Sequence, residues 1–194
     1  VIFPLPDQGG RLDKSAIPEI LERLPRMDAV LIGPGLGLGT GPEAVLTAVL
    51  THAACPVVVD ADGITLLVRH MDILRGRMAP TVLTPHDGEF TRLFGPVGED
   101  RMASARAAAR DSRSIVLLKG HRTCITDGTR DYRNTTGNPG MATGGSGDVL
   151  AGILASLLGQ GLEPLEAAAC AAWLHGKAGN LCAEDLGEYG MLPT

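Results

Sequence analysis

The sequence predicts an α/β domain built on a mostly parallel sheet whose two faces are both covered by helices. Three observations support this. Short, continuously apolar runs alternate with apolar patterns at helical spacing, polar or glycine-rich loops follow those runs directly, and a hairpin signal closes the series. Strands of a parallel sheet are buried on both faces, so they read as unbroken apolar runs. With 194 residues, 44% of them apolar, the chain is expected to form one domain, residues 1–194, with a substantial core.

The composition narrows the range of partners. The formal net charge is -5 and the basic residues form no long run, which argues against nucleic acid and anionic membranes as partners. No apolar stretch reaches transmembrane length. The cysteines are scattered without a CxxC pair, so we expect reduced core thiols in a cytoplasmic protein rather than disulfides or a zinc site. These cysteines are Cys55, Cys124, Cys170 and Cys182.

The first half of the chain is expected to form strand–loop–helix units in succession. Residues 1–5 have the apolar character of an extended strand, and residues 7–10 read as a turn. The elements expected after this turn are a helix at 15–24, a strand at 28–32, a helix at 42–52, a strand at 56–60, a helix at 64–69 and a strand at 81–83.

The second half is expected to end the sheet with a hairpin and then to form two apolar helices. The Asp127-Gly128 pair between two short runs is a hairpin turn signal. On the last helix we expect Trp173 in the core and His175 partly buried. The expected elements are a helix at 99–112, a strand at 114–118, the hairpin strands at 124–126 and 130–133, and helices at 149–158 and 165–183.

Candidate functional residues lie in the loops that follow successive strands. The GxGxGxG run at 33–39 is either a ligand-binding loop or a flexible turn, because it lacks the GxGxxG spacing of dinucleotide sites. After the next strand, Asp60 or Asp62 could hold a metal ion or a ribose hydroxyl, or Asp62 could cap the following helix. His86 follows the third strand. Because such loops share one edge of a parallel sheet, we expect His86 to lie near Gly35.

The stretch 134–152 is where we expect the chemistry. Its glycine-dense first part runs directly into an apolar helical pattern, which exposes backbone N–H groups at the positive end of a helix dipole and makes an anion site. Asp148 lies at its mouth. A carboxylate beside a phosphate is costly, but it is useful if it takes a proton from a hydroxyl that attacks the phosphate. Lys119, at the end of the strand 114–118, either meets a nucleotide phosphate or is an ordinary surface lysine.

These motifs occur in a recognisable order and spacing. They are Gly33-Pro34-Gly35-Leu36-Gly37, Val59-Asp60-Ala61-Asp62, Leu83-Thr84-Pro85-His86-Asp87-Gly88-Glu89-Phe90, Leu118-Lys119-Gly120 and the run 137–152, which contains Gly144-Gly145-Ser146-Gly147-Asp148-Val149-Leu150. Together they resemble the NAD(P)H-hydrate dehydratases, a branch of the ribokinase-like superfamily, over nearly the whole chain. The resemblance implies a three-layer α/β/α fold with a central, mainly parallel sheet and helices on both faces.

The resemblance also implies an activity. Members of this family repair damaged nicotinamide cofactor by dehydrating the S form of hydrated NADH or NADPH at the expense of a nucleotide. The Gly-Gly-Ser-Gly-Asp-Val-Leu version of the last motif is similar to the bacterial branch, which converts ADP to AMP and phosphate. A Mg²⁺ ion is expected at the nucleotide phosphates, with no ligands assigned.

Carried over motif by motif, the resemblance implies two groups of site residues. The hydrate would contact Gly35, Gly37, His86, Asn138 and Asp148, with Asp148 as the catalytic base. The nucleotide would contact Lys119, Gly120, His121, Arg122, Thr123, Gly144, Gly145, Ser146 and Gly147.

The chain departs from the family pattern at three places. Asp87 replaces the usual proline of the Thr-Pro-His-Pro-Gly-Glu motif, and His121 with Arg122 replaces the small residues common after the Lys-Gly pair. The family's first strand and its alanine- and glycine-rich substrate loop are not found before Val1. We therefore expect that an N-terminal part of the domain is missing from this sequence.

Two other functions fit some of the same residues. A ribokinase-like kinase that phosphorylates a vitamin precursor or a sugar with ATP would use the same phosphate cradle and Asp148. A nucleotide-sensing module without activity is the third interpretation. From the resemblance we also expect a homo-oligomer, specifically a tetramer, and an NAD(P)H-hydrate epimerase that is fused to this domain or paired with it.

Overall fold

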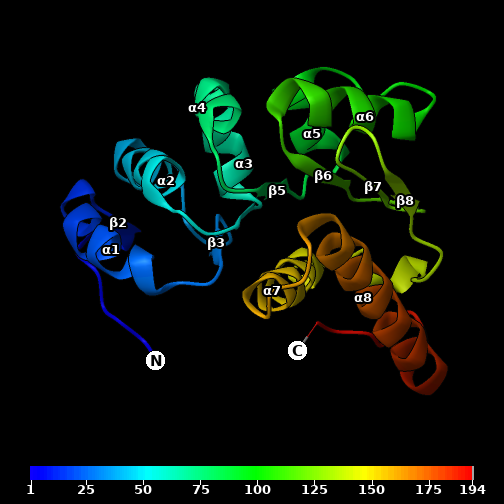
Figure 1. The fold of residues 1–194 in the computed structure, drawn as a ribbon. Coiled ribbons are helices and arrows are strands. Elements are labelled where there is room, and N and C mark those ends of the chain that lie inside the picture. Colours follow the sequence, from blue (N-terminus) through cyan, green and yellow to red (C-terminus); the bar gives the residue numbers. More distant parts are fainter. Residues whose placement is uncertain (194) are drawn as a thin grey trace.

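The computed structural model describes residues 1–193 and centres on a six-stranded sheet (Figure 1). The strands follow one another in chain order across this sheet. Strands β3 to β6 run parallel, and β7 and β8 form an antiparallel hairpin at one edge. The strands are β3 (Val30–Ile32), β4 (Val57–Val59), β5 (Thr81–Leu83), β6 (Ile115–Leu118), β7 (Cys124–Thr126) and β8 (Asp131–Arg133), and a small separate hairpin is formed by β1 (Asp7–Gln8) and β2 (Arg11–Leu12).

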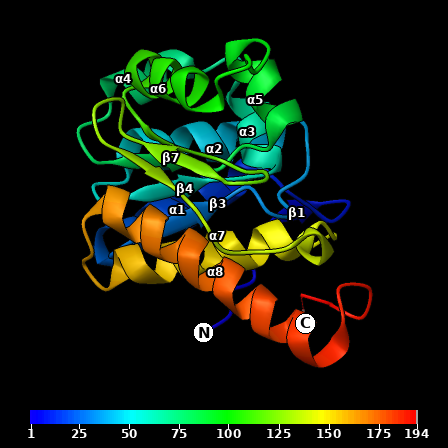
Figure 2. The same ribbon diagram turned by 90° about the vertical axis from the view of Figure 1, so that its right-hand side faces the viewer.

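Helices cover both faces of the sheet and make three layers, as Figures 1 and 2 show. Crossovers between parallel strands are right-handed as a rule, and a strand order that advances in one direction therefore places every crossover helix on the same face. The helices of that face are α2 (Thr40–His52), α3 (Asp62–Leu67), α4 (Met71–Gly76), α5 (Asp87–Phe94) and α6 (Arg101–Ser112), with α1 (Ile17–Arg23) packed against α2. The other face is covered by α7 (Ser146–Gly159) and α8 (Pro164–Leu186), and short 3-10 turns occupy Lys14–Ala16, Leu24–Arg26 and Pro139–Met141.

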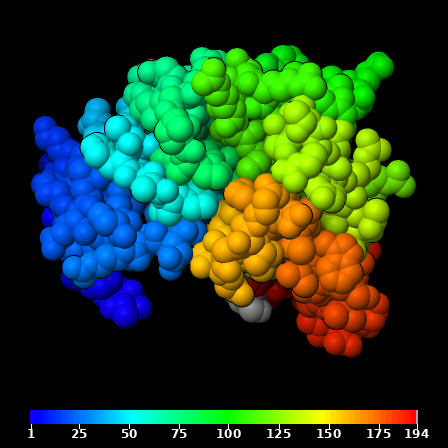
Figure 3. All heavy atoms as spheres, in the orientation of Figure 1, coloured from blue at the N-terminus to red at the C-terminus, as the bar shows by residue number. Residues whose placement is uncertain are grey.

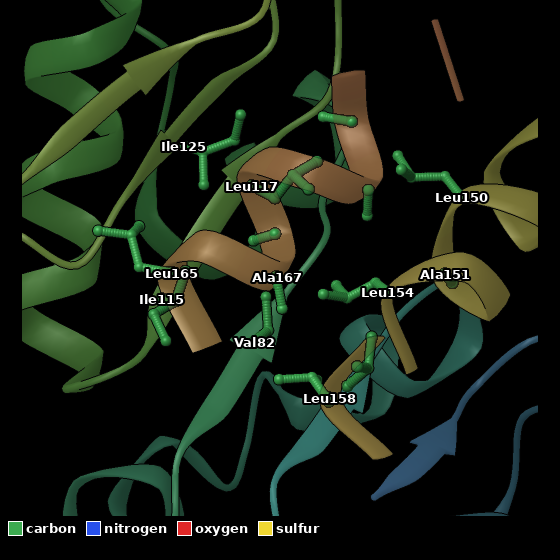
Figure 4. Packing of buried hydrophobic residues seen from close by; sticks show 14 residues of the cluster. Val82, Ile115, Leu117, Ile125, Leu150, Ala151, Leu154, Leu158, Leu165 and Ala167 are labelled. Atoms are coloured by element: carbon green, nitrogen blue, oxygen red, sulfur yellow. The ribbon is translucent and has the colours of Figure 1, made fainter. Parts of the chain in front are cut away.

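Successive residues of each strand point to opposite faces of the sheet, and this alternation divides the core. Val82 and Leu117 pack against Leu154 of α7 on one face (Figure 4). Their sequence neighbours Leu83 and Val116 face the crossover helices on the other. Every residue of β4, β5 and β6 is buried, which confirms the prediction of strands covered on both faces and the mainly parallel three-layer fold class. Strand β3 is only partly buried because it forms the other edge of the sheet.

Three smaller predictions are wrong. Residues 1–5 form no strand, since they lie outside the sheet, and Val1 and Ile2 are fully exposed. Trp173 is 49% exposed rather than in the core, because it lies on the outer side of α8 while Ala171 and Ala172 line the inner side. The expectation of thiols in the core holds only for Cys124, because Cys55 and Cys182 are half-buried and Cys170 is exposed.

The two ends of the chain lie apart from the sheet. Figure 3 shows the N-terminal segment in dark blue and the end of α8 in orange-red as projections at the lower left and lower right of the molecule. Across residues 1–193, none of the helices combines the length and the apolar character that crossing a membrane requires.

Candidate active site at the carboxyl edge of the sheet

The start of α7 has the geometry of an anion cradle. Gly145 precedes the helix in the left-handed region (φ 90°), a conformation that strongly favours glycine. The Ser146 N–H donates to the Thr143 carbonyl at 3.3 Å, and the first hydrogen bond from residue i to residue i−4 runs from the Val149 N–H to the Gly145 carbonyl at 3.1 Å. The amides of Gly147 and Asp148 therefore precede the helical ladder. These amides lie at the positive end of the helix dipole, where an anion is stabilised. The predicted helix therefore begins earlier than position 149, within the glycine motif itself.

Asp148 lies in the first turn of α7 and is exposed. Gly144 and Gly145 are also exposed, whereas Ser146 and Gly147 are half-buried. The predicted catalytic carboxylate thus faces solvent at the mouth of the cradle, as a base that must reach a bound substrate requires.

Beneath the cradle lies a buried ionic cluster that the sequence analysis did not predict. Lys119, at the end of β6, places its Nζ 2.7 Å from Oδ1 of Asp60 and 3.7 Å from Oε2 of Glu89. The side chains of Asp60 and Glu89 are only 2% and 8% exposed. A Cβ added to Gly147 would lie 3.4 Å from the same Nζ. Lys119 is therefore not an ordinary surface lysine, but a cation held by two carboxylates next to the start of α7.

His86 is the N-cap residue of α5, and backbone N–H groups of the first helical turn hold its side chain. Its Nδ1 accepts hydrogen bonds from the N–H groups of Gly88 (3.0 Å) and Glu89 (3.3 Å). In return, Oε2 of Glu89 accepts from the His86 N–H at 2.9 Å, which completes a capping box. Because Nδ1 is an acceptor, the neutral ring carries its proton on Nε2. The side chain is 56% exposed and its Nε2 lies 3.6 Å from Oε1 of Glu89, so this N–H faces both that carboxylate and the solvent.

The glycine loop after β3 is a shaped turn rather than a flexible one. At Gly33 (φ 129°) a Cβ would lie 1.8 Å from the carbonyl oxygen of Asp60, so the two strand-end loops touch. Gly37 donates its N–H to Oδ2 of Asp62 at 2.8 Å. Asp62 thus holds the glycine loop and does not cap α3, whose N-cap position, Ala61, makes no side-chain hydrogen bond.

Helix α8 acts as a support for the loop between β8 and α7. Asn138, predicted to contact the hydrate, donates from Nδ2 to the Gly179 carbonyl at 2.9 Å and accepts from the Gly140 N–H at 3.0 Å. Thr136 donates to the carbonyl of Trp173 at 2.9 Å. A Cβ at Gly176 would lie 2.3 Å from the Thr136 hydroxyl, so this glycine permits the close approach of the loop. The carboxamide of Asn138, which is half-buried, therefore ties the loop to α8.

His175 on α8 is half-buried, as predicted, and faces the turn at the start of α7. Its Nε2 lies 3.4 Å from the Ser146 hydroxyl. Burial lowers the pKa of the His175 imidazole below its ordinary value of 6.5, so the ring is neutral at pH 7.

The predicted nucleotide loop, residues 119–123, is a tight turn on the surface. Gly120 has a φ of 150° and its carbonyl accepts from the Thr123 hydroxyl at 3.0 Å. His121 and Arg122 are exposed, and Arg122 takes a left-handed φ of 55°. The two residues that depart from the family pattern thus point away from the core and disturb none of its packing.

The structure brings several predicted residues together at one edge of the sheet. Contacts join the ends of β4 and β6, the start of α5 and the start of α7, through Asp60, Lys119, Glu89 and Gly147. Glu89 was detectable in the sequence as the third residue after His86, the spacing of a capping box. No feature of the sequence near Asp60 or near Lys119 indicates that the two side chains pair. Within the described part of the chain, no three His, Cys, Asp or Glu side chains form a ready-made metal site.

Comparison with known proteins shows the family to which this chain is similar. The family described as NAD(P)H-hydrate dehydratase matches residues 6–194. A curated protein of Moorella thermoacetica, the bifunctional NAD(P)H-hydrate repair enzyme Nnr, is 46% identical over 189 residues, which are 94% of this chain and 36% of that protein. The ADP-dependent (S)-NAD(P)H-hydrate dehydratase of Neisseria meningitidis serogroup B is 41% identical over 83% of this chain and 57% of its own length.

A solved structure is similar as well. The ADP/ATP-dependent NAD(P)H-hydrate dehydratase of Bacillus subtilis, co-crystallised with ATP and Mg²⁺ and soaked with CoA, gives a TM-score of 0.77 at 30% identity. This match covers 93% of the present chain and 74% of that one, and the ribokinase-like fold class is confirmed. The chain spans about a third of the length of the Moorella relative and just over half of the Neisseria relative.

Proposed function

Because the chain belongs to the NAD(P)H-hydrate dehydratase family, we propose that it carries out the ADP-dependent dehydration of the S form of hydrated NADH or NADPH. The products are NADH or NADPH, AMP and phosphate. The observation that carries the proposal is the start of α7, where two amides that precede the helical ladder lie next to an exposed carboxylate, Asp148. An anion cradle with an acid at its mouth suits transfer of a phosphoryl group to a hydroxyl.

The proposed chemistry begins at the hydroxyl on the nicotinamide-derived ring. Asp148 removes its proton as the oxygen attacks the terminal phosphorus of ADP, and the bond from that phosphorus to the oxygen of AMP breaks. The amides of Gly147 and Asp148 stabilise the negative charge on the phosphoryl group. Phosphate then leaves with the electrons of the carbon–oxygen bond, driven by the lone pair of the ring nitrogen. Loss of a proton from the neighbouring ring carbon restores the dihydropyridine.

We assign the remaining residues in two groups. His86 offers its Nε2 proton to the hydrate, and the loop that holds Gly35 and Gly37 lines the same side. Asn138 acts on the hydrate through the loop that it shapes, because its carboxamide is already bonded to α8. The nucleotide side comprises Lys119, Gly120, His121, Arg122, Thr123, Gly144, Gly145, Ser146 and Gly147.

A Mg²⁺ ion fits the chemistry of this edge. Mg²⁺ is commonly held by one or two carboxylates together with substrate phosphates. Asp60 and Glu89 are two buried carboxylates that face one ammonium beside Gly147, so they are the donors that we propose for the ion. When bound, the ion would neutralise charge on the nucleotide phosphates.

Three properties of the whole protein belong to the same proposal. A homo-oligomer, in particular a tetramer, and a fused or separate NAD(P)H-hydrate epimerase are expected from the family resemblance. A relative that carries the name bifunctional supports a second activity in the longer proteins. We also propose a cytoplasmic location, because the nicotinamide cofactors that need repair are abundant in the cytoplasm.

The small-molecule kinase is the less favoured function. The curated relatives at 40% to 49% identity are named for hydrate repair or hydrate dehydration, and none of those matches is named as a kinase. A kinase would release a stable phosphorylated alcohol, whereas the dehydratase releases inorganic phosphate.

The test is to replace the proposed base. Hydrated NADH is incubated with ADP and Mg²⁺, and the recovery of dihydropyridine absorbance and the release of AMP are followed. Asp148→Asn is expected to lower turnover by at least ~10²-fold, because the amide cannot accept the proton. The matched control is Asp72→Asn, which removes another exposed first-turn acid, on α4. Near-normal turnover of Asp148→Asn would rule out this assignment of the base.

A further inference from the structure

Arg101 joins two loops of the site although no site motif contains it. It is the first residue of α6, and its Nη1 lies 2.7 Å from Oδ2 of Asp87. Its Nη2 donates to the main-chain carbonyl of Lys119 at 2.9 Å. One guanidinium thus links the turn that holds His86 to the beginning of the predicted nucleotide loop.

The fit at the nucleotide loop is close. A Cβ at Gly120 would lie 2.7 Å from Nη2 of Arg101, and Gly120 has a φ of 150°, so a glycine is needed for the loop to lie on the guanidinium. The Nε of Arg101 is buried and finds no hydrogen-bond partner among the described residues. An unpaired buried donor is costly. The side chain nevertheless adopts this position, in which its two terminal nitrogens reach the two loops.

Asp87 is one of the positions where this chain departs from the family pattern, since it replaces the usual proline of the Thr-Pro-His-Pro-Gly-Glu motif. It is the first helical residue of α5, where proline is favoured because its missing N–H and fixed φ suit a helix start. The side chain of Asp87 is 59% exposed, so burial does not explain the residue. Its contact with Arg101 does, because the carboxylate gives the guanidinium an anchor on the His86 turn.

We propose that Arg101 is a positioning residue for nucleotide binding: it holds the loop 119–123 in its binding conformation, with Asp87 as the anchor. Such a clamp lowers the conformational entropy that the loop loses when ADP binds. Asp87 acts only through Arg101. Substituting Asp87 therefore has no further effect on ADP binding in a protein that already lacks the Arg101 side chain. This inference rests on the proposed function, since it assigns the loop to ADP.

The experiment compares Arg101→Met, Asp87→Asn and the double variant with the unaltered protein. ADP affinity is measured by calorimetry, and KM for ADP and kcat are measured in the dehydration assay. Arg101→Met is expected to raise Kd and KM for ADP about tenfold, the effect of losing a charge-assisted hydrogen bond, and to leave kcat at saturating ADP within about twofold. Asp87→Asn should raise both less, and the double variant should match Arg101→Met.

The matched control is Arg106→Met on the same helix. Arg106 pairs with Asp131 of β8 and forms no hydrogen bond or ion pair with residues 119–123, so its loss removes a surface ion pair of α6 and leaves the clamp intact. Hydrogen exchange of the amides supplies a readout that needs no substrate. Arg101→Met should speed exchange in residues 119–123, whereas Arg106→Met should leave that segment unchanged.

Each result decides between the clamp and its alternatives. Unchanged ADP affinity in Arg101→Met, an equal effect of Arg106→Met, or additive effects of Arg101→Met and Asp87→Asn would overturn the proposal. The proposed function fails separately, if the unaltered protein neither binds ADP nor restores the dihydropyridine. In that case the exchange of residues 119–123 still tells whether Arg101 holds the loop.

Discussion

Replacing Lys119 by methionine should destabilise the protein strongly, because it leaves two carboxylates without their cation. Methionine keeps most of the length and volume of lysine, so the change removes charge rather than packing. Asp60 and Glu89 have side chains that are 2% and 8% exposed, and water cannot replace the ammonium at either. Removing one partner of a buried ion pair typically costs about 3–5 kcal/mol.

The structure places Lys119→Met at the lower end of that range. Glu89 keeps the hydrogen bond from the His86 N–H at 2.9 Å, whereas Asp60 loses the ammonium 2.7 Å from its carboxylate. We therefore expect a loss of about 3 kcal/mol in the free energy of unfolding, equal to a fall of about 6–12 °C in Tm for a domain of this size. Urea denaturation followed by circular dichroism measures it.

A second substitution separates charge from other causes. Asp60→Asn removes one of the two stranded charges and keeps the shape of the side chain. Added to Lys119→Met, it should recover about 1 kcal/mol or more, because an amide is cheaper to bury than an unpaired carboxylate. A Lys119→Met protein that loses less than about 1 kcal/mol, or a double variant that is less stable than Lys119→Met, would refute the assignment of these three groups as one ionic cluster.

Two further predictions concern the backbone and the pH dependence of stability. Gly33→Ala should lower the free energy of unfolding by at least ~3 kcal/mol, because the added Cβ would meet the Asp60 carbonyl and φ is 129°. Gly152→Ala, which adds its Cβ in open space within α7, should instead raise the free energy of unfolding by about 0.5–1 kcal/mol. Equal denaturation midpoints for the two variants would contradict the close approach at Gly33. Since burial lowers the pKa of His175, the unfolded chain takes up a proton before the folded one does as pH falls below 6.5, and stability is lost in that direction. His175→Gln should lose less stability than the unaltered protein between pH 7.5 and pH 5.5; an equal loss would show that His175 does not titrate in this range.

Most of the fold could be predicted because the signals are local. The apolar runs at 56–60, 81–83 and 114–118 became β4, β5 and β6 with shifts of only a residue or so at their ends. The Asp127-Gly128 pair correctly marked the β7–β8 hairpin. Trp173 was mispredicted because an isolated aromatic residue in an alanine-rich helix does not show which side of the helix faces the sheet.

The site could be predicted only in part. The glycine motif revealed the anion cradle, because a helix start with left-handed glycine before it has a sequence signature. The side chains of Asp62 and Asn138 both hold loops, which the sequence did not indicate. Whether an acid caps a helix, binds a ligand or braces a neighbouring loop depends on what lies across from it, which residue type does not specify.

The sequence by itself determined the order of the strands and helices, the position of the cradle and the presence of Asp148 at its mouth. Periodicity, glycine placement and helix starts act over a few residues, so they can be read from the chain. Only the tertiary structure decided that Lys119 forms an ion pair with Asp60, 59 residues away, and that Arg101 bridges Asp87 to the Lys119 carbonyl. Lys119 meets Asp60 because parallel strands carry their ends to one edge, where charged groups distant in sequence must neutralise one another in a space that excludes water.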